Sequence, residues 1–460
     1  MRLHAHDYRA PDASGIVDGA ILMHREVAEL LDGHRSVAWH DLTRGTGSVA
    51  SASPGDVVYA GAGPYAFLYH LWRERTKGRF RIVREVHTAL WSGYWAQEEL
   101  CAPLLRPGDL VLFPTEYTRR LFIRHLASVT EDNSAVAYPM LDRLPRLPPA
   151  RIPAPDEPLR IGYLGALSLA KNFDQVLSVF ARCHRASPGR VSLLCAGKPN
   201  HTRWETDSVL AELGRQGAEP DAVRMLGVLG QHELAGFFSE IDVLLFPSTA
   251  SRETLGRVVL EALAHGIPVL GADIGPAVEL LPARNLVPTV LDTETAFSMG
   301  RVEALGRVDE DALVEKLCGR DFEPADMTAE SPYQDRTFLR ALSGEAVRQE
   351  IAYDARLTDR LTVERRKGVD LDRALARSEQ IFTDFFRRRR DDGLLSAVDA
   401  LPEESAQDRR QLRRLITEGS RNLADYRAFP RLLDALVLPP LGYGLTPEPV
   451  SATHGKDMTA

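Results

Sequence analysis

Cysteine is scarce in this chain, which has four cysteines among 460 residues. None forms a Cys-x-x-Cys pair or lies near a histidine cluster at metal-ligand spacing; the four are Cys101, Cys183, Cys195 and Cys318. Small disulfide-held secreted domains and structural zinc sites both need closely spaced cysteine or histidine ligands, so the sequence argues against both classes. We therefore expect four free, mostly buried thiols in a reducing cytoplasm.

Long apolar runs are also missing. No stretch of about 18 consecutive apolar residues occurs, so the sequence predicts no membrane-spanning helix. The opening residues, MRLHAHD, lack the apolar core of a signal peptide. We therefore expect a cytoplasmic protein.

Basic charge is not in excess. The chain has 56 Lys and Arg against 64 Asp and Glu, for a net charge of −8 at pH 7. Because binding to a phosphate backbone needs a clear basic excess, we expect no nucleic-acid partner. Residues 382–390 combine three phenylalanines with four arginines. A weak contact with an anionic membrane surface is one interpretation of them, and an ordinary solvated helix is the preferred one.

Short apolar runs alternate with amphipathic stretches over the first 140 residues or so. The predicted strands are residues 2–6, 36–40, 56–60, 80–86, 109–113 and 135–138. The predicted helices between them include residues 19–31 and 116–126. Strand and helix in this alternation predict a parallel sheet covered on both faces.

A proline-rich stretch interrupts this alternation. Residues 144–158 read LPRLPPARIPAPDEP, with six prolines in fifteen residues, which predicts a stiff linker. The alternation then restarts, with predicted strands at residues 159–164, 191–196, 223–226, 242–246 and 268–271. From about residue 328 the chain reads as charged helices.

We therefore predict an α/β protein of two doubly wound, Rossmann-like domains that face a cleft. The predicted parts are an N-terminal domain (1–143), the linker (144–158), a second domain (159–327) and a helical extension (328–460) that packs back on the first domain. Ligands of such sheets bind at the carboxyl ends of the strands, so the loops that follow strands are where a site is expected.

The most informative stretch is DVLLFPSTASRETLGRVVLEALAHGIPVLGADIGPAVE, residues 242–279. A buried strand ends before Pro247-Ser248, and Glu253 is predicted to open a helix. Gly256 lets the backbone approach a ligand, and the free N–H groups of a helix start bind anions. On one helix Glu253 and Glu261 would point about 80° apart, so they would contact two parts of an extended ligand rather than one atom.

This stretch resembles the donor site of the retaining family 4 glycosyltransferases, which have the GT-B fold. The matching positions, in order, are Pro247-Ser248, Glu253, Gly256, Glu261-Ala262 and Gly266-Ile267-Pro268-Val269. The chain departs from the family at Leu255, where Phe is common, and at Gly275-Pro276, where Gly-Gly is common. The resemblance implies that Glu261 binds the ribose hydroxyls of a nucleotide and that Glu253 binds the transferred sugar. A carboxylate accepts from two hydroxyls, which suits both roles.

A second resemblance covers residues 161–172, IGYLGALSLAKN, which are similar to the family's phosphate-binding loop. Gly165 and Lys171 match its Gly and Lys, but Ala166 stands where the family has Arg. The resemblance implies that Lys171 and the helix start at Leu255–Arg257 hold the diphosphate. Arg257 is our candidate for the missing cation, and an ordinary exposed helix arginine is the alternative.

Two further positions are in the N-terminal domain. His87 follows a predicted strand, as does the family's histidine that contacts the donor sugar, and Gly15 precedes a helix like the family's glycine loop. Trp91, Tyr94 and Trp95 could stack on an acceptor or pack in the core.

The resemblance implies a retaining glycosyltransferase, of the hexosyltransferase type, that moves a sugar from a nucleotide-diphosphate sugar to an acceptor without metal or other cofactor. Asp370-Leu371-Asp372 fits a metal motif but lies in a charged helical region and not after a strand, so we expect no metal there. The sequence specifies neither the donor nor the acceptor, which could be a small molecule, a glycan or a lipid-linked sugar.

No residue stands out as a covalent nucleophile, so front-face attack is the expected mechanism. Two alternatives stay open. One is a nucleotide-sugar epimerase or phosphorylase on the same fold. The other is a catalytically weakened, partner-binding protein, which Ala166 and the extra C-terminal helices would fit.

Overall fold

The computed structural model describes the greater part of both predicted domains. The described residues are 2–6, 19–34, 36–40, 52–61, 69–70, 73, 77–86, 101, 104–125, 128–292, 296–298, 304–325, 331–347, 350–360 and 362–364.

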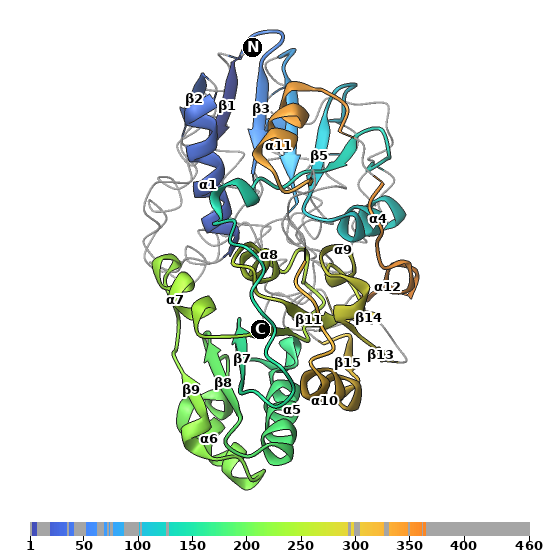
Figure 1. Ribbon diagram of the computed structural model, residues 1–460. Coiled ribbons are helices and arrows are strands. Elements are labelled where there is room, and N and C mark those ends of the chain that lie inside the picture. Colours follow the sequence, from blue (N-terminus) through green and yellow to red (C-terminus); the bar gives the residue numbers. More distant parts are fainter. Residues whose placement is uncertain are drawn as a thin grey trace, which may run out of the picture.

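The first unit is a parallel six-stranded sheet in the order β2-β1-β3-β4-β5-β6 (Figure 1). Its strands are β1 (Leu3–His6), β2 (Val37–His40), β3 (Val57–Ala60), β4 (Arg81–Glu85), β5 (Leu110–Phe113) and β6 (Ser134–Val136). Its helices include α1 (Gly19–His34), α4 (Glu116–His125) and the short η4 (Leu141–Arg143). All four residues of β3 are buried, as expected for a strand covered on both faces.

The second unit is a parallel sheet of six strands in the order β12-β11-β10-β7-β8-β9. The strands are β7 (Leu159–Leu164), β8 (Val191–Ala196), β9 (Val223–Met225), β10 (Val243–Phe246), β11 (Val269–Ala272) and β12 (Leu286–Val287). The α-helices are α5 (Phe173–Ala186), α6 (Thr206–Arg215), α7 (Leu234–Ser239), α8 (Arg257–Ala264), α9 (Ala277–Leu280) and α10 (Glu310–Gly319). Short helices are η5 (Leu169–Lys171), η6 (Thr202–Trp204), η7 (Pro220–Ala222), η8 (Gln231–Glu233) and η9 (Ala283–Asn285).

These two sheets confirm the fold class predicted from the sequence. Strands β7 and β8 have the predicted bounds, and the other predicted strands differ only at their ends. The sixth strand of the second sheet, β12, is missing from the prediction because it has only two residues, Leu286 and Val287. Strand order reverses between β7 and β10, so the loops that follow these two strands flank a topological switch point.

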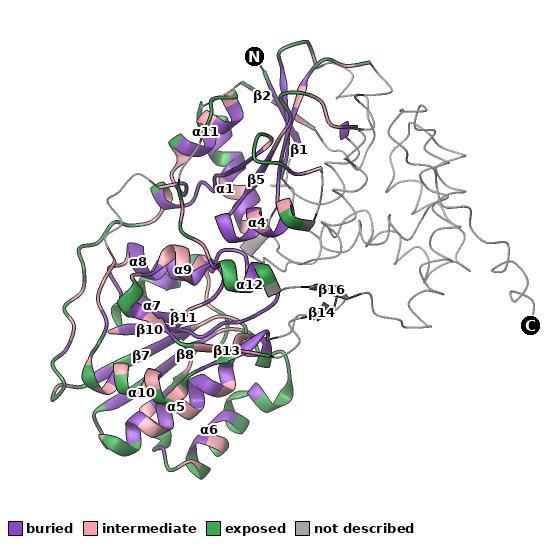
Figure 2. Cartoon of the chain, turned by 90° about the vertical axis from the view of Figure 1, so that its right-hand side faces the viewer, coloured by how far each residue is buried: buried purple, intermediate pink, exposed green. Residues whose placement is uncertain are grey.

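Beyond β12, the chain adds small elements to the second unit and then returns to the first. Strands β13 (Thr289–Leu291) and β15 (Gly306–Val308) pair antiparallel, and β14 (Ala296–Ser298) pairs with β16 (Thr362–Glu364). Helix α11 (Asp335–Ser343) packs in the core of the first unit together with α1, and α12 (Ala355–Arg360) follows (Figure 2). The rings of Tyr59 and Phe338 meet edge-on, with centroids 5.7 Å apart.

The proline-rich linker lies against the second unit. The backbone N–H of Leu147 donates to the carbonyl of Ala264 (2.9 Å), and that of Ala150 donates to the carbonyl of Gly266 (2.9 Å). Gly266 has φ +76°, and a Cβ there would lie 2.2 Å from the carbonyl oxygen of Pro148. Glycine is therefore required at position 266 both by its backbone conformation and by this close approach.

The two units touch directly, with α8 and α9 at their boundary (Figure 1). Thr115, in the loop between β5 and α4, donates from its hydroxyl to the carbonyl of Thr254 (2.7 Å). Leu255 and Leu260 of the second unit belong to the apolar cluster of the first. The described helices include none that is long and apolar enough to cross a membrane. All four cysteines are free, and the sulfurs of Cys183 and Cys318 lie 3.9 Å apart.

Candidate functional site

Two predicted site residues meet at the switch point of the second sheet. Lys171 comes from the loop after β7, and Glu253 comes from the loop after β10. The ammonium group of Lys171 donates to the carboxylate of Glu253, which also accepts from the hydroxyl of Ser248 (3.0 Å). The side chains of Lys171 and Glu253 are 27% and 13% exposed, so the pair is screened from bulk water but still reachable.

Asn172 holds the two loops together. Its backbone is left-handed, with φ 52°, and its side chain is fully buried. The amide nitrogen donates to the Pro247 carbonyl (3.0 Å), the Thr249 hydroxyl (3.0 Å) and the Gly306 carbonyl (3.1 Å). Sequence reasoning missed this role. The available signal was an asparagine directly before a helix, because asparagine adopts the left-handed conformation more readily than most residues.

The loop that contains Gly165 is approached closely by the loop after β8, which the glycine at position 197 allows. The N–H of Gly165 donates to the carbonyl of Ala196 (3.0 Å), and a Cβ on Gly197 would lie 1.7 Å from the Gly165 carbonyl oxygen. The hydroxyl of Tyr163 donates to the carbonyl of Ala166 (2.9 Å), and Ala166 itself is exposed. The position that carries arginine in the resembled family is thus an exposed methyl group at the edge of the loop.

Helix α8 begins later than predicted. It starts at Arg257, and its N-cap is Gly256 in the left-handed conformation, with φ 70°. A Cβ on Gly256 would lie 2.7 Å from the Phe246 ring. Glu253 therefore lies in the preceding loop, where its N–H donates to the Ala250 carbonyl (2.9 Å). The prediction that Glu253 opens the helix was wrong, and the helical angle between Glu253 and Glu261 does not apply.

Arg257 connects helix α8 of the second unit to helix α1 of the first. Its Nε donates to Glu261 on the next turn of α8 (2.9 Å), and its two terminal nitrogens donate to Glu26 of helix α1 (2.8 and 2.6 Å). The side chains of Arg257, Glu26 and Glu261 are 14%, 16% and 7% exposed. The interpretation of Arg257 as an ordinary exposed helix residue is therefore wrong.

The same ion pairs set the ionisation of these groups. Burial works to lower the pKa of Arg257, but the hydrogen-bonded ion pair with Glu26 and the charge of Glu261 outweigh burial and raise that pKa. Burial raises the pKa of Glu261, and the neighbouring Arg257 opposes this shift. The arginine therefore favours the ionised carboxylate at position 261.

Glu279 makes a further polar contact, which sequence reasoning missed. It lies on α9, and its carboxylate accepts from the N–H groups of Glu116 (2.8 Å) and Tyr117 (2.6 Å) at the start of α4 in the first unit. Burial raises the pKa of Glu279 to about 8, although both backbone hydrogen bonds act in the opposite direction. Glu279 thus caps a helix across the boundary between the units.

Leu255 is buried and packs towards the first unit, while Gly15 and His87 lie outside the described residues. So do Trp91, Tyr94 and Trp95, residues 382–390 and the Asp370-Leu371-Asp372 motif. Among the described residues, no group of three or more His, Cys, Asp or Glu is arranged to hold a metal ion.

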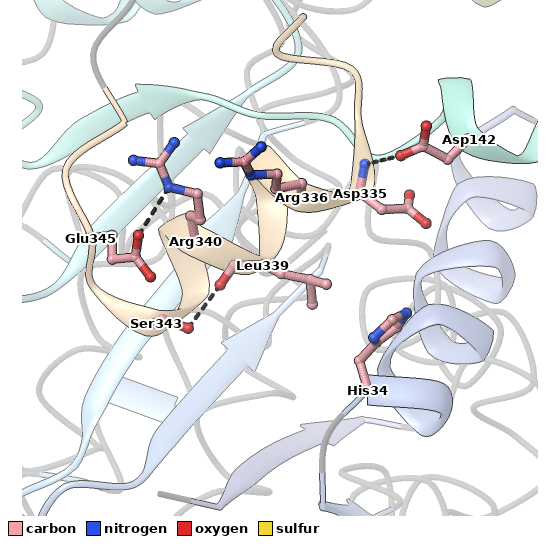
Figure 3. Close-up of a pocket in the computed structure, with 8 residues that line it drawn as sticks. All are labelled: His34, Asp142, Asp335, Arg336, Leu339, Arg340, Ser343 and Glu345. Atoms are coloured by element: carbon pink, nitrogen blue, oxygen red, sulfur yellow. Dashed lines mark hydrogen bonds and ion pairs between the residues drawn. The ribbon is translucent and has the colours of Figure 1, made fainter. Parts of the chain in front are cut away.

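Two cavities lie away from the switch point. Figure 3 shows one of about 470 Å³ at α11, where the carboxylate of Asp142 accepts from the N–H of Asp335 (2.8 Å) and His34 lies opposite. The other, of about 1060 Å³, lies beside the edge strand β6 and residues 341–347 and 350–352. Neither is lined by Lys171 or Glu253.

Comparison with known proteins points to the second unit. Residues 149–288 match the model of the family described as Glycosyl transferases group 1. A D-inositol 3-phosphate glycosyltransferase from Stackebrandtia nassauensis is 34% identical over 128 residues, which are 27% of this chain and 28% of that protein. A glycogen synthase from Mycobacterium tuberculosis is 29% identical over 141 residues, which are 31% of this chain and 30% of that protein.

Among solved structures, Anabaena HepE in complex with UDP-glucose has 20% sequence identity and a TM-score of 0.47, and the match covers 75% of this chain and 98% of that chain. The chain spans under a third of the length of the two curated relatives named above. Over residues 149–288, which contain Lys171, Glu253 and Glu261, this chain matches the glycosyl transferases group 1 family.

Proposed function

We propose that this protein is a glycosyltransferase that moves a sugar from a nucleotide-diphosphate sugar to an acceptor. The observation that carries the proposal is the contact between Lys171 and Glu253 at the switch point, within the segment that matches the glycosyl transferases group 1 family. A cation and a carboxylate there suit a donor with a charged diphosphate and a polyhydroxylated sugar.

The donor would lie across the loops of the second unit. Glu261 would accept from the ribose hydroxyls, and Glu253 would accept from hydroxyls of the transferred sugar. The Lys171 ammonium has three donors, so it can bind a phosphate oxygen while it keeps its contact with Glu253. Gly165 and Gly256 leave the backbone open to the diphosphate, and Gly15 and His87 would contact the donor from the first unit.

The chemistry would consist mainly of stabilising the leaving group. Negative charge develops on the diphosphate as the glycosidic bond breaks, and Lys171 with the N-terminus of α8 would offset it. We propose front-face attack with retention of configuration, in which the leaving diphosphate oxygen takes the acceptor proton. In this scheme no metal ion and no other cofactor takes part.

Nucleotide binding is the direct test. Calorimetry with UDP, GDP and ADP should find one that binds, and Glu261→Gln should weaken its binding by about 1–3 kcal/mol, or about 5- to 150-fold. Glu205→Gln, at an exposed glutamate of the same unit, is the matched control and should bind as the wild type does. Equal affinity of wild type and Glu261→Gln would contradict the proposed site.

Turnover should not depend on divalent metal. With the donor identified by binding, product formation in excess chelator should stay close to the untreated rate. A complete loss that Mg²⁺ restores would contradict the metal-free scheme, and inversion at the anomeric carbon would contradict front-face attack.

Ala166 supports a second candidate, a nucleotide-binding protein with weakened catalysis. The exposed methyl group offers no charge to the leaving diphosphate, whereas a preorganised cation there stabilises the transition state. Ala166→Arg should then raise the turnover rate while nucleotide affinity changes little. A rate that falls would indicate that another cation already occupies the space.

A further inference from the structure

The carboxylates of Glu253 and Glu261 are held in different ways. Glu253 is paired within its own unit by Lys171, but Glu261 shares its partner, Arg257, with Glu26 of the first unit. Arg257 and Glu26 are 231 residues apart in sequence. The ion pair therefore spans the boundary between the units and ends on the residue proposed to bind ribose.

From this arrangement we propose that Arg257 is a positioning residue that couples ribose binding at Glu261 to the contact between the two units through Glu26. The inference rests on the proposed function. It also changes the role of Arg257, which the sequence suggested as a cation for the diphosphate. Three of the five N–H groups of the guanidinium already donate to Glu26 and Glu261, and Tyr138 is a further hydrogen-bond partner, so little of the group is left for a phosphate.

The geometry fixes the direction of the Glu261 carboxylate. A guanidinium is planar, and its bidentate pair with Glu26 sets the plane in which Nε lies. Nε then donates to one oxygen of Glu261, Oε1. Gln231 also hydrogen-bonds to the Glu261 carboxylate. A carboxylate has about four acceptor positions, so two remain for ribose hydroxyls, and the residue can be held and still bind.

The burial of all three side chains makes the coupling strong. Ion pairs that are this little exposed are poorly screened, and removing one partner leaves a buried charge uncompensated. If Glu26 is neutralised, Arg257 keeps Glu261 as its only ionised partner in this group and can turn towards it. Its guanidinium would then compete with the ribose hydroxyls for the carboxylate oxygens.

The coupling is reciprocal. Separating the two units breaks the Arg257–Glu26 bonds and has the same effect on Glu261 as neutralising Glu26. By linkage, a nucleotide that binds better in the joined arrangement must also favour that arrangement. The neighbouring contact from Thr115 to Thr254 and the packing of Leu255 against the first unit would break in the same separation.

The test uses the full chain and Glu26→Gln. Glu29→Gln, at an exposed glutamate one turn further along α1, is the matched control. Calorimetry measures the affinity for whichever of UDP, GDP and ADP the wild type binds, and for its 2′,3′-dideoxy counterpart. We expect Glu26→Gln to weaken the ribonucleotide about 5- to 30-fold, within the usual range of coupling between sites. The dideoxy nucleotide should bind Glu26→Gln and the wild type alike.

The dideoxy comparison separates positioning from general damage, because a misfolded site would weaken both nucleotides. The inference is overturned if both fall equally in Glu26→Gln or if neither falls. If Glu26→Gln does not fold, Glu26→Asp keeps the charge on a shorter side chain and should show a smaller loss confined to the ribonucleotide. A wild type that binds no nucleoside diphosphate would instead refute the proposed function.

Discussion

Gly256→Ala tests whether the start of α8 is fixed by its backbone and by the Phe246 ring. Gly256 has φ +70°, and alanine in this region costs about 1–2 kcal/mol. The substitution also restricts the unfolded chain, which returns about 0.4–1 kcal/mol. The added Cβ would lie 2.7 Å from the Phe246 ring and 3.3 Å from a methyl of Val259, and overpacking of this kind costs about 1–3 kcal/mol.

The sum is a loss of about 1–5 kcal/mol in the free energy of unfolding. Gly227→Ala is the matched control, because Gly227 has φ +71° and an added Cβ there meets nothing within 4 Å. The control should lose about 1.6 kcal/mol or less, from the backbone conformation alone. The difference between the two variants isolates the contact with Phe246.

Urea unfolding followed by circular dichroism measures both variants. The two midpoints should separate at an unchanged slope, since the surface exposed on unfolding is the same. Phe246→Leu should reduce the loss caused by Gly256→Ala because the ring edge is gone. If Gly256→Ala costs no more than Gly227→Ala, the ring yields and the steric part of the reasoning is refuted.

Three further predictions concern Glu279, Asn172 and the pair of cysteines Cys183 and Cys318. Burial raises the pKa of Glu279 from 4.5 to about 8. The stability that this shift contributes is therefore present at low pH and is lost as the pH rises from 4.5 to about 8. Glu279→Gln should flatten the pH dependence of thermal unfolding over this pH range. Asn172→Gly keeps the left-handed backbone but removes three buried hydrogen bonds and should cost about 2–4 kcal/mol in urea unfolding. Diamide, a thiol oxidant, should join Cys183 to Cys318, whose sulfurs are 3.9 Å apart, as peptide mapping without reduction would show.

Each of these predictions has an outcome that would contradict it. An unchanged pH profile in Glu279→Gln would mean that the carboxylate keeps its ordinary pKa. For Asn172→Gly, a loss below about 1 kcal/mol would show that other groups replace the lost bonds. Cys318→Ser should abolish the cross-link, whereas a cross-link that persists in that variant would assign it to another pair.

The sequence predicted the two sheets because each strand is a short apolar run followed by an amphipathic stretch. Strand β12 was not predicted because two residues are too few to show an apolar pattern. The start of α8 was misplaced because the residues from Glu253 to Leu255 are compatible with a helix. The turn depends on the left-handed backbone of Gly256, which composition does not specify.

The candidate site was predictable for residues that lie in the loops directly after the strands of one sheet. Lys171 and Glu253 follow neighbouring strands of one sheet, so their loops meet. Glu26 and Glu279 could not be found this way, because their partners lie in the other unit and the pairing depends on how the units dock. A lone glutamate on a predicted helix looks the same in sequence whether it faces water or a buried arginine.

Residues 138–141, which lead out of the first unit, and residues 332–333, which belong to the returning chain, run side by side. The backbone N–H of Tyr138 donates to the carbonyl of Pro332 (3.0 Å), and the N–H groups of Met140 and Leu141 both donate to the carbonyl of Tyr333 (2.9 and 2.8 Å). Further along the linker, the backbone N–H of Leu147 donates to the carbonyl of Ala264 at the end of α8.

A body held by one flexible tether can turn about any axis, but a body held by two bonded, neighbouring strands turns about the line that they define. The linker therefore acts less as a spacer than as one of two paired segments that together form a hinge. We expect the first unit to rotate as one rigid body about this hinge. Each closure would then return Glu26 to the same place against Arg257.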